Sequence, residues 1–304
     1  MEIIELRGGG YSARINLSRG ANCIALRNET YGATILREPD YNKGLDNPYL
    51  YGMPVLFPVN RISGGSFEFE GRTYRFPINE PATNCFLHGE LHRTPFSAEF
   101  VSDNRVTAVY RATKEQPYLE FPHEFTMEIT YELTENGLEH RVRVTNLSDR
   151  NMPLLLGFHT TFRLPFLANT RNEELRVKVD LSEEYERNMA TYLPTGICPA
   201  PDDVTRRLAD GSFTPNQPIS RHYRRGDSAA MAIVDQKAGL SVVYENSMDY
   251  GFRLIYSDGM EYICLEPQTC LANCANSPFP REKAGFSHLE PGQSREYWSR
   301  IGIR

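Results

Sequence analysis

The stretch Thr126-Met127-Glu128-Ile129-Thr130-Tyr131-Glu132-Leu133-Thr134-Glu135-Asn136-Gly137-Leu138-Glu139-His140-Arg141-Val142-Arg143-Val144 decides the fold. Apolar and polar residues alternate from Met127 to Leu133 and again from Leu138 to Val144. Alternation with a period of two is typical of a β-strand that buries one face. An Asn-Gly pair between two such runs favours a tight hairpin, because both residues tolerate the positive φ angles of a type I′ turn. The stretch therefore predicts two paired antiparallel strands.

The same period extends over most of the chain. Residues 67–69 and 74–78 alternate on either side of Gly71, which predicts a second hairpin. Helical periodicity is nearly absent apart from a short turn expected around 47–56, and no linker or repeat is evident. We predict an all-β fold, a large antiparallel β-sandwich in a single domain over 1–304, with a split into two domains as the alternative. Further strands are expected at 105–111, 153–162, 174–180, 229–234, 240–245, 252–256, 261–266 and 295–302.

Composition bounds the functional classes. The chain has 304 residues, 40% hydrophobic and 24% charged, which is typical of a soluble globular protein. A net charge of -6 disfavours nucleic acid as a partner, because phosphate binding needs a basic surface. Residues 1–7 carry no apolar signal core and no apolar run is long enough to span a bilayer, so we expect no membrane association and a cytoplasmic location.

The six cysteines are scattered through the chain, a pattern typical of reduced, buried thiols rather than of a disulfide framework. Cys270 and Cys274 lie four residues apart without a second cysteine pair, so a zinc site there is only weakly indicated.

One carboxylate has an unusual position. In Tyr262-Ile263-Cys264-Leu265-Glu266-Pro267-Gln268-Thr269 the apolar Ile263 and Leu265 face one side of an expected strand. Glu266 faces the other side, and Pro267 is expected to end the strand because it cannot donate to the ladder. We expect a polar loop over 268–276. An acid at a strand end beside a loop is either simply solvated or positioned for function.

Two further segments carry candidate polar groups. Asn60 and Arg61 follow an apolar run, 53–59, and precede a glycine turn. Arg61 is either a structural partner of a nearby acid or a fork that donates to sugar hydroxyls or a carboxylate. In 84–93 the order His-Gly-Glu-Leu-His differs from the zinc-protease pattern, and Gly89 and Pro95 disfavour the helix which that pattern needs. We therefore expect no metal there and interpret His88 as a hydrogen-bond donor to a ligand.

His159 follows the apolar run 154–156 and continues an expected buried strand. It is either a core histidine or a general acid, because imidazole titrates nearest neutrality. His140 alternates with Val142 and Val144 without polar company, so we assign it to packing.

Several short motifs occur in a fixed order from about residue 51 to the end of the chain, and together they resemble those of the aldose 1-epimerase (galactose mutarotase) family. The motifs are Asn60-Arg61-Ile62 with Gly64-Gly65-Ser66-Phe67, Leu87-His88-Gly89, His159, Leu193-Pro194-Thr195-Gly196, Leu265-Glu266-Pro267-Gln268-Thr269 and Pro291-Gly292-Gln293.

The resemblance implies a galactose mutarotase-like supersandwich and a mutarotase that interconverts the α and β anomers of an aldose. Glu266 would be the general base at the anomeric hydroxyl, and His159 the acid at the ring oxygen. The resemblance implies no metal and no cofactor, a small sugar as substrate, and leaves monomer and homodimer open. Four further residues would bind the sugar: His88, Arg61, Asn60 and Gln268.

The chain departs from the family pattern in the expected sugar-binding shell. Ser220 stands where the family has an Asp, Leu254 where many members have Gln, and Glu90-Leu91-His92 where members often have Phe-Ala-Arg. A basic cluster of Arg221, Arg224 and Arg225 is either a grip for phosphate or sulfonate or a solvated loop face. Three hypotheses follow: a mutarotase of a free aldose, an epimerase of a phosphorylated or otherwise anionic sugar, and a non-catalytic carbohydrate-binding protein.

Overall fold

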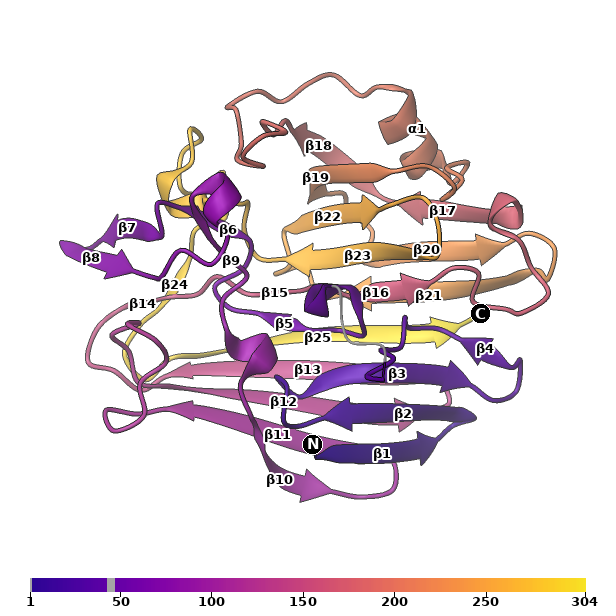
Figure 1. Cartoon of the computed structure of the whole chain (residues 1–304), viewed down its shortest axis with the longest axis horizontal. Helices are drawn as coiled ribbons and strands as arrows, with labels where there is room; N and C mark the ends of the chain where they lie inside the picture. The colour runs from indigo at the N-terminus through magenta and orange to yellow at the C-terminus, as the bar shows by residue number, and fades with distance from the viewer. Residues whose placement is uncertain (1, 43–46) are drawn as a thin grey trace.

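The computed structural model describes residues 2–42 and 47–304 and consists mainly of antiparallel strands (Figure 1). The largest sheet has eight strands, in the spatial order Ser97–Val101 (β10), Arg105–Ala112 (β11), Phe125–Thr134 (β12), Gly137–Asn146 (β13), Ser294–Ile303 (β25), Leu240–Asn246 (β21), Ala230–Asp235 (β20) and Leu175–Val179 (β17). The second sheet has seven strands, in the order Leu181–Tyr185 (β18), Ile219–Arg225 (β19), Phe252–Ser257 (β22), Tyr262–Gln268 (β23), Gly157–Phe158 (β15) and Val55–Leu56 (β5), with Thr161–Arg163 (β16) also paired to β23.

Smaller elements complete the chain. A four-stranded sheet contains Ile3–Gly8 (β1), Tyr11–Asn16 (β2), Asn22–Asn28 (β3) and Ala33–Thr34 (β4). The two-stranded sheets pair Met152–Pro153 (β14) with His288–Leu289 (β24), Arg61–Ser63 (β6) with Cys85–Leu87 (β9), and Ser66–Phe69 (β7) with Arg72–Arg75 (β8). The helical segments are the α-helix Asp203–Asp210 (α1) and the 3-10 turns Pro48–Leu50, Pro81–Thr83, Leu91–Arg93, Asn172–Glu174 and Cys274–Asn276. None of the helices in the described ranges is long and apolar enough to cross a membrane.

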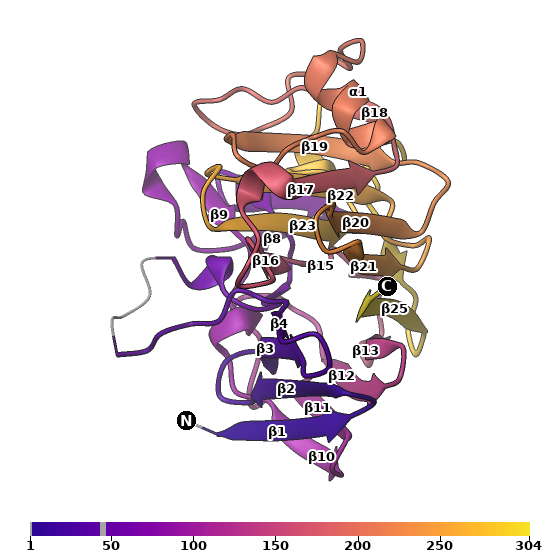
Figure 2. The same ribbon diagram turned by 90° about the vertical axis from the view of Figure 1, so that its right-hand side faces the viewer.

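The sheets lie in two layers. In the lower half of Figure 2, β2 and β3 of the four-stranded sheet lie to the left of β12 and β13 of the eight-stranded sheet. Between the layers, the ring of Phe162 on β16 lies 5.5 Å from that of Tyr244 on β21. Most of the buried apolar residues form one large cluster that includes Leu6 and Ile301, and Leu50, Tyr262 and Cys264 form a small second one. The predicted antiparallel β-sandwich is therefore confirmed, while its formation by a single domain stays a proposal.

The Asn-Gly hairpin has the predicted register. β12 and β13 pair from Phe125 with Asn146 down to Thr134 with Gly137, and every second side chain of β12 is buried. His140, assigned to packing, is 1% exposed and its ring centroid lies 4.9 Å from that of Tyr131. The hairpin around Gly71 is also present as β7 and β8. The six cysteines carry free thiols, in agreement with the sequence.

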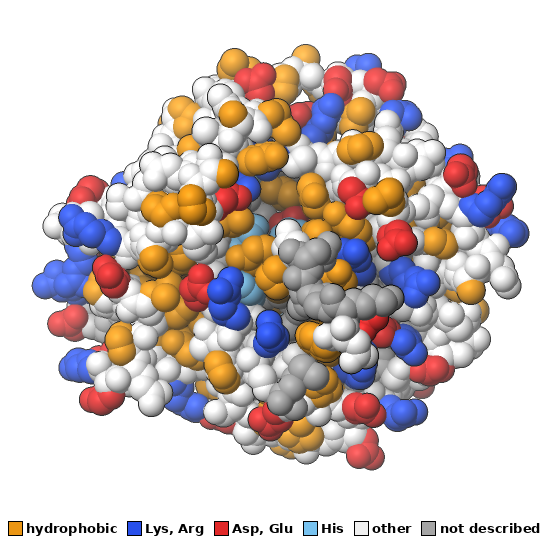
Figure 3. All heavy atoms as spheres, viewed as in Figure 1, with side chains coloured by type: hydrophobic (Ala, Val, Ile, Leu, Met, Phe, Trp, Pro, Cys, Tyr) orange, Lys and Arg blue, Asp and Glu red, His pale blue; other side chains and the backbone are white. Residues whose placement is uncertain are grey.

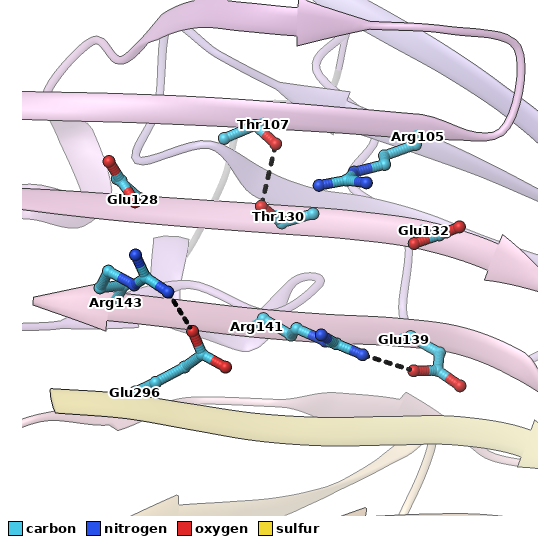
Figure 4. Close-up of a pocket in the computed structure, with 9 residues that line it drawn as sticks. All are labelled: Arg105, Thr107, Glu128, Thr130, Glu132, Glu139, Arg141, Arg143 and Glu296. Carbon is cyan, nitrogen blue, oxygen red and sulfur yellow. Dashed lines mark hydrogen bonds and ion pairs between the residues drawn. The ribbon is translucent and has the colours of Figure 1, made fainter.

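The polar residues that alternate with the buried ones along β12 and β13 lie on the outer face of the eight-stranded sheet. A depression of about 300 Å³ on this face is lined by side chains of opposite charge from neighbouring strands, which Figure 4 shows. Arg143 Nη2 lies 3.0 Å from Glu296 Oε2, and Arg105 stands directly opposite Glu132. Cross-strand pairs of this kind stabilise an exposed sheet face modestly. Because its charges compensate one another, this depression does not indicate a ligand site.

The expectation that Pro267 ends its strand is wrong. β23 continues to Gln268, and Pro267 pairs with Arg253 on β22. The amides of Leu265 and Thr269 donate to the opposite edge, towards Thr160 and Leu156. Alternate residues of a strand point their amides to the same edge, so the missing N–H of Pro267 falls at that edge, where β15 and β16 are interrupted.

Two other segments differ from the prediction. Residues 219–225 are not a loop but the strand β19, and 203–210 form the helix α1, which had not been predicted. Asp202 caps α1 by accepting from the amide of Thr205 at 2.9 Å, and Gly211 ends it with a φ of 84°. The expected strand 153–162 is broken into β14, β15 and β16, and the loop expected at 268–276 is mostly buried.

Candidate active site

Three strands of the seven-stranded sheet present one face to the candidate site. In the strand register, His222 on β19 stands opposite Leu254 on β22, and Leu254 stands opposite Glu266 on β23. Directly opposite residues of antiparallel strands share a face, so the three side chains form one row. The adjacent row on the same face contains Ser220, Tyr256 and Cys264.

The two residues expected to transfer protons are in contact. His159 Nε2 lies 3.2 Å from Glu266 Oε1, and the two residues are 7% and 1% exposed. The His159 amide donates to the carbonyl of Pro54 at 3.0 Å, which fixes the backbone beside β15. Neither Glu266 Oε1 nor His159 Nδ1 makes a hydrogen bond within the described part of the chain. Figure 3 shows histidine side chains at the floor of a hollow, near the end of β23.

Burial shifts the titration of both groups. It raises the pKa of Glu266 to about 8, against the opposing effects of the hydrogen bond from Gln268 and the positive charges of Arg187 and Arg61. Burial also lowers the pKa of His159 to about 3. At neutral pH the empty site therefore holds one transferable proton, which resides on the carboxyl group while the imidazole is neutral.

A chain of amides orients the carboxyl group. Gln268 Nε2 donates to Glu266 Oε2 at 3.0 Å, and Asn60 Nδ2 donates to Gln268 Oε1 at 3.1 Å. The side-chain oxygen of Asn60 accepts from the amide of Arg61 at 3.0 Å. Asn60 has a φ of 62°, a conformation that Asn adopts more readily than most residues. These bonds occupy Oε2 of Glu266 and leave Oε1 directed at His159.

His88 is placed as a donor. Its Nδ1 accepts from the Asn60 amide at 3.3 Å, and its own amide donates to the Asn60 carbonyl at 2.9 Å. Burial holds the pKa of His88 well below its usual range, so the ring is neutral and carries its hydrogen on Nε2. The His88 ring lies 5.6 Å from that of His159 and 4.7 Å from that of Tyr49. Its free donor edge is therefore available beside the proton-transfer pair.

Of the two roles predicted for Arg61, the structure shows the pairing with a nearby acid. Its Nε and Nη2 donate to both carboxylate oxygens of Glu80, at 2.6 and 2.7 Å. Its guanidinium also lies 4.5 Å from the ring centroid of Tyr192. Two of its five N–H donors are thus occupied, and a role in holding the sugar remains a proposal.

The basic cluster expected at 221–225 does not form a grip. Arg221 is paired with Asp202 at 2.7 Å and Glu184 at 3.0 Å, beside α1. Arg225 donates to three backbone carbonyls. Arg224 lies on the other face of β19, the face that carries Ser220 and His222, and is exposed over the ring of Phe252. A strand points successive side chains to opposite faces, so the three arginines cannot converge on one anion.

Two residues at this face were missed from the sequence. Arg187, just beyond β18, is 8% exposed, and its Nη2 donates to Ser220 Oγ at 2.9 Å. His222 is fully buried, and neither of its ring nitrogens has a hydrogen-bond partner among the residues that the structure describes. Neither residue lies in a recognisable motif, and their placement follows from strand register.

His159, Cys264 and Glu266 could in principle hold a metal ion, because their ligand atoms lie within 4.8 Å of one another. Burial raises the pKa of the Cys264 thiol well above its usual range, and that of Glu266 to about 8. Metal ligation needs the deprotonated forms of both groups. Metal binding at these three residues would therefore have to release both protons.

A sequence model of aldose 1-epimerases matches residues 2–302. The chain belongs to the aldose 1-epimerase family. The resemblance inferred from short motifs is thereby confirmed, and family and fold support a sugar epimerase or mutarotase role.

Relatives of this aldose 1-epimerase family member agree with that assignment. A galactose mutarotase-like protein from Clostridium acetobutylicum is 32% identical, with a TM-score of 0.92 over 99% of this chain and 95% of the other. A GalM/aldose epimerase homologue from C. elegans is 18% identical with a TM-score of 0.78, over 100% and 98% of the two chains, which shows the shared fold alone.

A curated relative, the uncharacterized protein YihR of Escherichia coli K12, is 25% identical over 160 residues. That match covers 52% of this chain and 49% of YihR, so it spans about half the length of either protein.

Proposed function

We propose that the protein is a mutarotase, which interconverts the α and β anomers of an aldose by opening and reclosing the ring at C1. The observation that carries this proposal is the contact between Glu266 Oε1 and His159 Nε2 at 3.2 Å, in which Oε1 has no hydrogen bond from the described residues. A buried carboxyl group without a full set of partners is costly, which favours a ligand or reactant as its missing partner.

The reaction needs one proton removed and one delivered. Glu266 takes the proton from the anomeric hydroxyl, while His159 gives a proton to the ring oxygen. The bond between C1 and the ring oxygen breaks, and an aldehyde forms. After rotation about the bond between C1 and C2, Glu266 returns its proton to the aldehyde oxygen while His159 takes back the proton of the hydroxyl group that attacks C1. The anomeric hydroxyl oxygen and the ring oxygen are both bonded to C1. A base and an acid that contact each other can therefore exchange protons with the two oxygens in one binding position of the sugar.

The proton count of the site fits this cycle. The pair holds one proton, either as neutral carboxyl and neutral imidazole or as carboxylate and imidazolium. The neutral form dominates in the empty site, because burial disfavours both charges. The charged form is the one that opens the ring, and the neutral form is the one that faces the aldehyde. The sugar and the nearby guanidinium groups favour transfer of the proton from Glu266 to His159.

The neighbouring groups have supporting roles. His88 donates from Nε2 to a sugar oxygen, and the remaining donors of Arg61 bind sugar hydroxyls. Asn60 and Gln268 orient the carboxyl group of Glu266 and complete the binding surface. None of these steps uses a metal or a redox cofactor.

Replacing Glu266 with glutamine tests the proposal. Glu266→Gln keeps the shape of the side chain and the bond from Gln268 but removes the base, so enzymatic mutarotation should fall about 10²–10⁴-fold. Polarimetry on freshly dissolved aldoses, corrected for the spontaneous rate, measures this. The exposed Glu120→Gln serves as the matched control and should retain the wild-type rate.

Near-normal turnover in Glu266→Gln would contradict the assigned role. If the wild-type protein binds aldoses but accelerates mutarotation of none of them, the non-catalytic carbohydrate-binding alternative is correct instead.

A further inference from the structure

Three arginines in the described part of the chain are less than one tenth exposed, and one of them differs from the others. Arg225 donates to the carbonyls of Gly226, Ser247 and Ser228, and Arg253 donates to those of Asp180 and Ser228 at 2.7 Å each. Within residues 2–42 and 47–304, the Arg187 side chain makes one hydrogen bond, from Nη2 to Ser220 Oγ. Its exposed fraction is 8%, against 6% for Arg225 and 1% for Arg253. Burial alone therefore does not explain why Arg187 has fewer partners.

Arg187 also lacks a counter-charge. None of its nitrogens lies within 4.0 Å of a carboxylate oxygen in the described ranges. Burial lowers the pKa of Arg187 to about 10, which leaves it charged at neutral pH. A buried charge without a partner is costly, and removal of one member of a buried ion pair typically costs several kcal/mol. The arrangement resembles one half of an ion pair.

The charges around Arg187 do not supply the other half. Arg61, whose positive charge disfavours that of Arg187, is already paired with Glu80. Glu266 holds its proton in the empty site, because burial raises its pKa to about 8. His222 lies near enough to be influenced by Arg187 and is a buried neutral ring with unpartnered nitrogens. Glu184 also favours the charge of Arg187, but it is held by Arg221 at 3.0 Å, so the carboxyl groups near Arg187 are either protonated or already paired.

The position of Arg187 connects it to the reaction site. Its partner Ser220 lies on the same sheet face as Glu266, one row away. Tyr192 links the two guanidinium groups, with Arg61 4.5 Å and Arg187 5.8 Å from its ring centroid. A sugar whose C1 lies at Glu266 and His159 can direct a substituent from elsewhere on its ring towards Arg187.

We propose that Arg187, held by Ser220, binds an anionic substituent of the substrate, so that the sugar is an acidic aldose carrying a carboxylate, phosphate or sulfonate group. The ring-opening step rests on the function proposed above, but the anion subsite does not. Guanidinium forms paired hydrogen bonds with all three anions, which share the required chemistry. Arg187 thus takes the anion-binding role that the sequence analysis considered for Arg221 and Arg225, whose donors are hydrogen-bonded within the protein.

Binding to sugars that cannot open their ring tests the subsite independently of turnover. Calorimetry with methyl α-glucoside, methyl α-glucuronide, and the 6-phosphate and 6-sulfonate analogues of the same glycoside separates the anions from one another and from the neutral sugar. At least one anionic glycoside should bind the wild-type protein about 10-fold or more tightly than methyl α-glucoside, and Arg187→Met should remove about 10- to 100-fold of that affinity. The same variant should change the affinity for methyl α-glucoside less than about 3-fold.

Two further variants sharpen the test. Ser220→Asp places a carboxylate on the hydrogen-bond partner of Arg187, so it should supply an internal counter-charge and abolish the preference for the anion while neutral-sugar binding persists. Arg141→Gln, on the exposed outer face of the eight-stranded sheet, removes a positive charge far from the site and should leave the preference intact.

Equal affinity for neutral and anionic glycosides, or equal loss of both in Arg187→Met, overturns the subsite. Loss confined to Arg224→Gln would place the anion at the exposed Arg224 side chain on β19 and also overturn the subsite. If the binding preference is observed but no aldose of either kind mutarotates faster than in buffer, the subsite stands and the proposed mutarotase function fails.

Discussion

At the scale of single residues, the shared proton of Glu266 and His159 predicts a pH dependence. In the proposed mechanism the pair is active while it holds one proton, so the enzymatic rate constant kcat/KM should be constant from about pH 5 to 7. It should fall about tenfold per pH unit above about pH 8, where the pair loses that proton. Exchange NMR between anomers, with the spontaneous rate subtracted at each pH, measures the profile. A rate that keeps rising through pH 9 would exclude a shared-proton pair.

The sequence predicted part of this site. Glu266, His159, His88, Asn60 and Gln268 were expected from motifs, and the structure places them together. The pairing of Arg61 with Glu80 was one of two stated alternatives.

Arg187 was not predicted, because a single arginine between a strand and a loop has no pattern of its own. Its importance depends on what it lacks, namely a carboxylate partner, and only the packing of neighbouring strands shows that. The arginines on β19 misled the sequence interpretation for the same reason, since their partners Asp202 and the backbone carbonyls lie elsewhere in the chain.

At the scale of elements, the site depends on the close approach of the segment after β9 to the segment after β5. Gly89 forms an isolated bridge with Phe57 and has a φ of 66°. A Cβ at this position would overlap the carbonyl oxygen of Phe57. Gly89→Ala should therefore lower the free energy of unfolding by about 3 kcal/mol or more, or prevent folding, and displace His88. Urea denaturation followed by far-UV circular dichroism measures the loss.

Gly71→Ala is the matched control, because Gly71 also has a positive φ, 72°, but open space where the Cβ would lie. It should cost only about 1 kcal/mol, the conformational part of the penalty. Equal losses in the two variants would show that backbone strain, and not the contact with Phe57, governs this position.

Elements in which apolar and polar residues alternate regularly were predictable from the sequence, and elements that depend on partners distant in the chain were not. The hairpins at Gly71 and Asn136-Gly137 follow from local turn chemistry and alternation. The sequence of β19 indicated a basic loop, because the partners that compensate Arg221 and Arg225 are distant in the chain and cannot be recognised from the sequence. The short strands β14, β15 and β16 merge into one apolar run in the sequence, and their breaks follow from tertiary pairing. The short helix α1 covers the end of β17 and β18 and carries many charges, so no long apolar period marked it.

At the scale of the whole molecule, the sandwich buries the groups that it uses for chemistry. Period-two patterning was enough to predict two layers of antiparallel strands, because alternation specifies which face of each sheet enters the core. The order of strands in the sheets depends on long-range pairing, which a single sequence does not specify. Enclosing Glu266 between β22 and the neighbouring segments gives the carboxyl group its raised pKa and carries a cost in stability.

That cost predicts how the stability of the fold depends on pH. Because the pKa of Glu266 is about 8 in the folded protein and about 4.5 in the unfolded chain, the folded state binds more protons between these values. The stabilising contribution of this group is complete below about pH 4.5 and is lost as the pH rises through 8. The variant Glu266→Gln cannot ionise at this position. The difference in free energy of unfolding between the variant and wild type should therefore shift in favour of the variant by roughly 3–5 kcal/mol when the pH is raised from 5 to 8.5. Chemical denaturation at the two pH values measures the difference, with Glu120→Gln as an exposed control that should show no such change.

Because Glu266→Gln also loses the proposed base, a gain in stability together with a loss of turnover would identify Glu266 as a group retained for chemistry rather than for folding. A Glu266→Gln protein whose stability follows wild type at both pH values would instead mean that the carboxylate is solvated, which would also remove the basis for a shared proton.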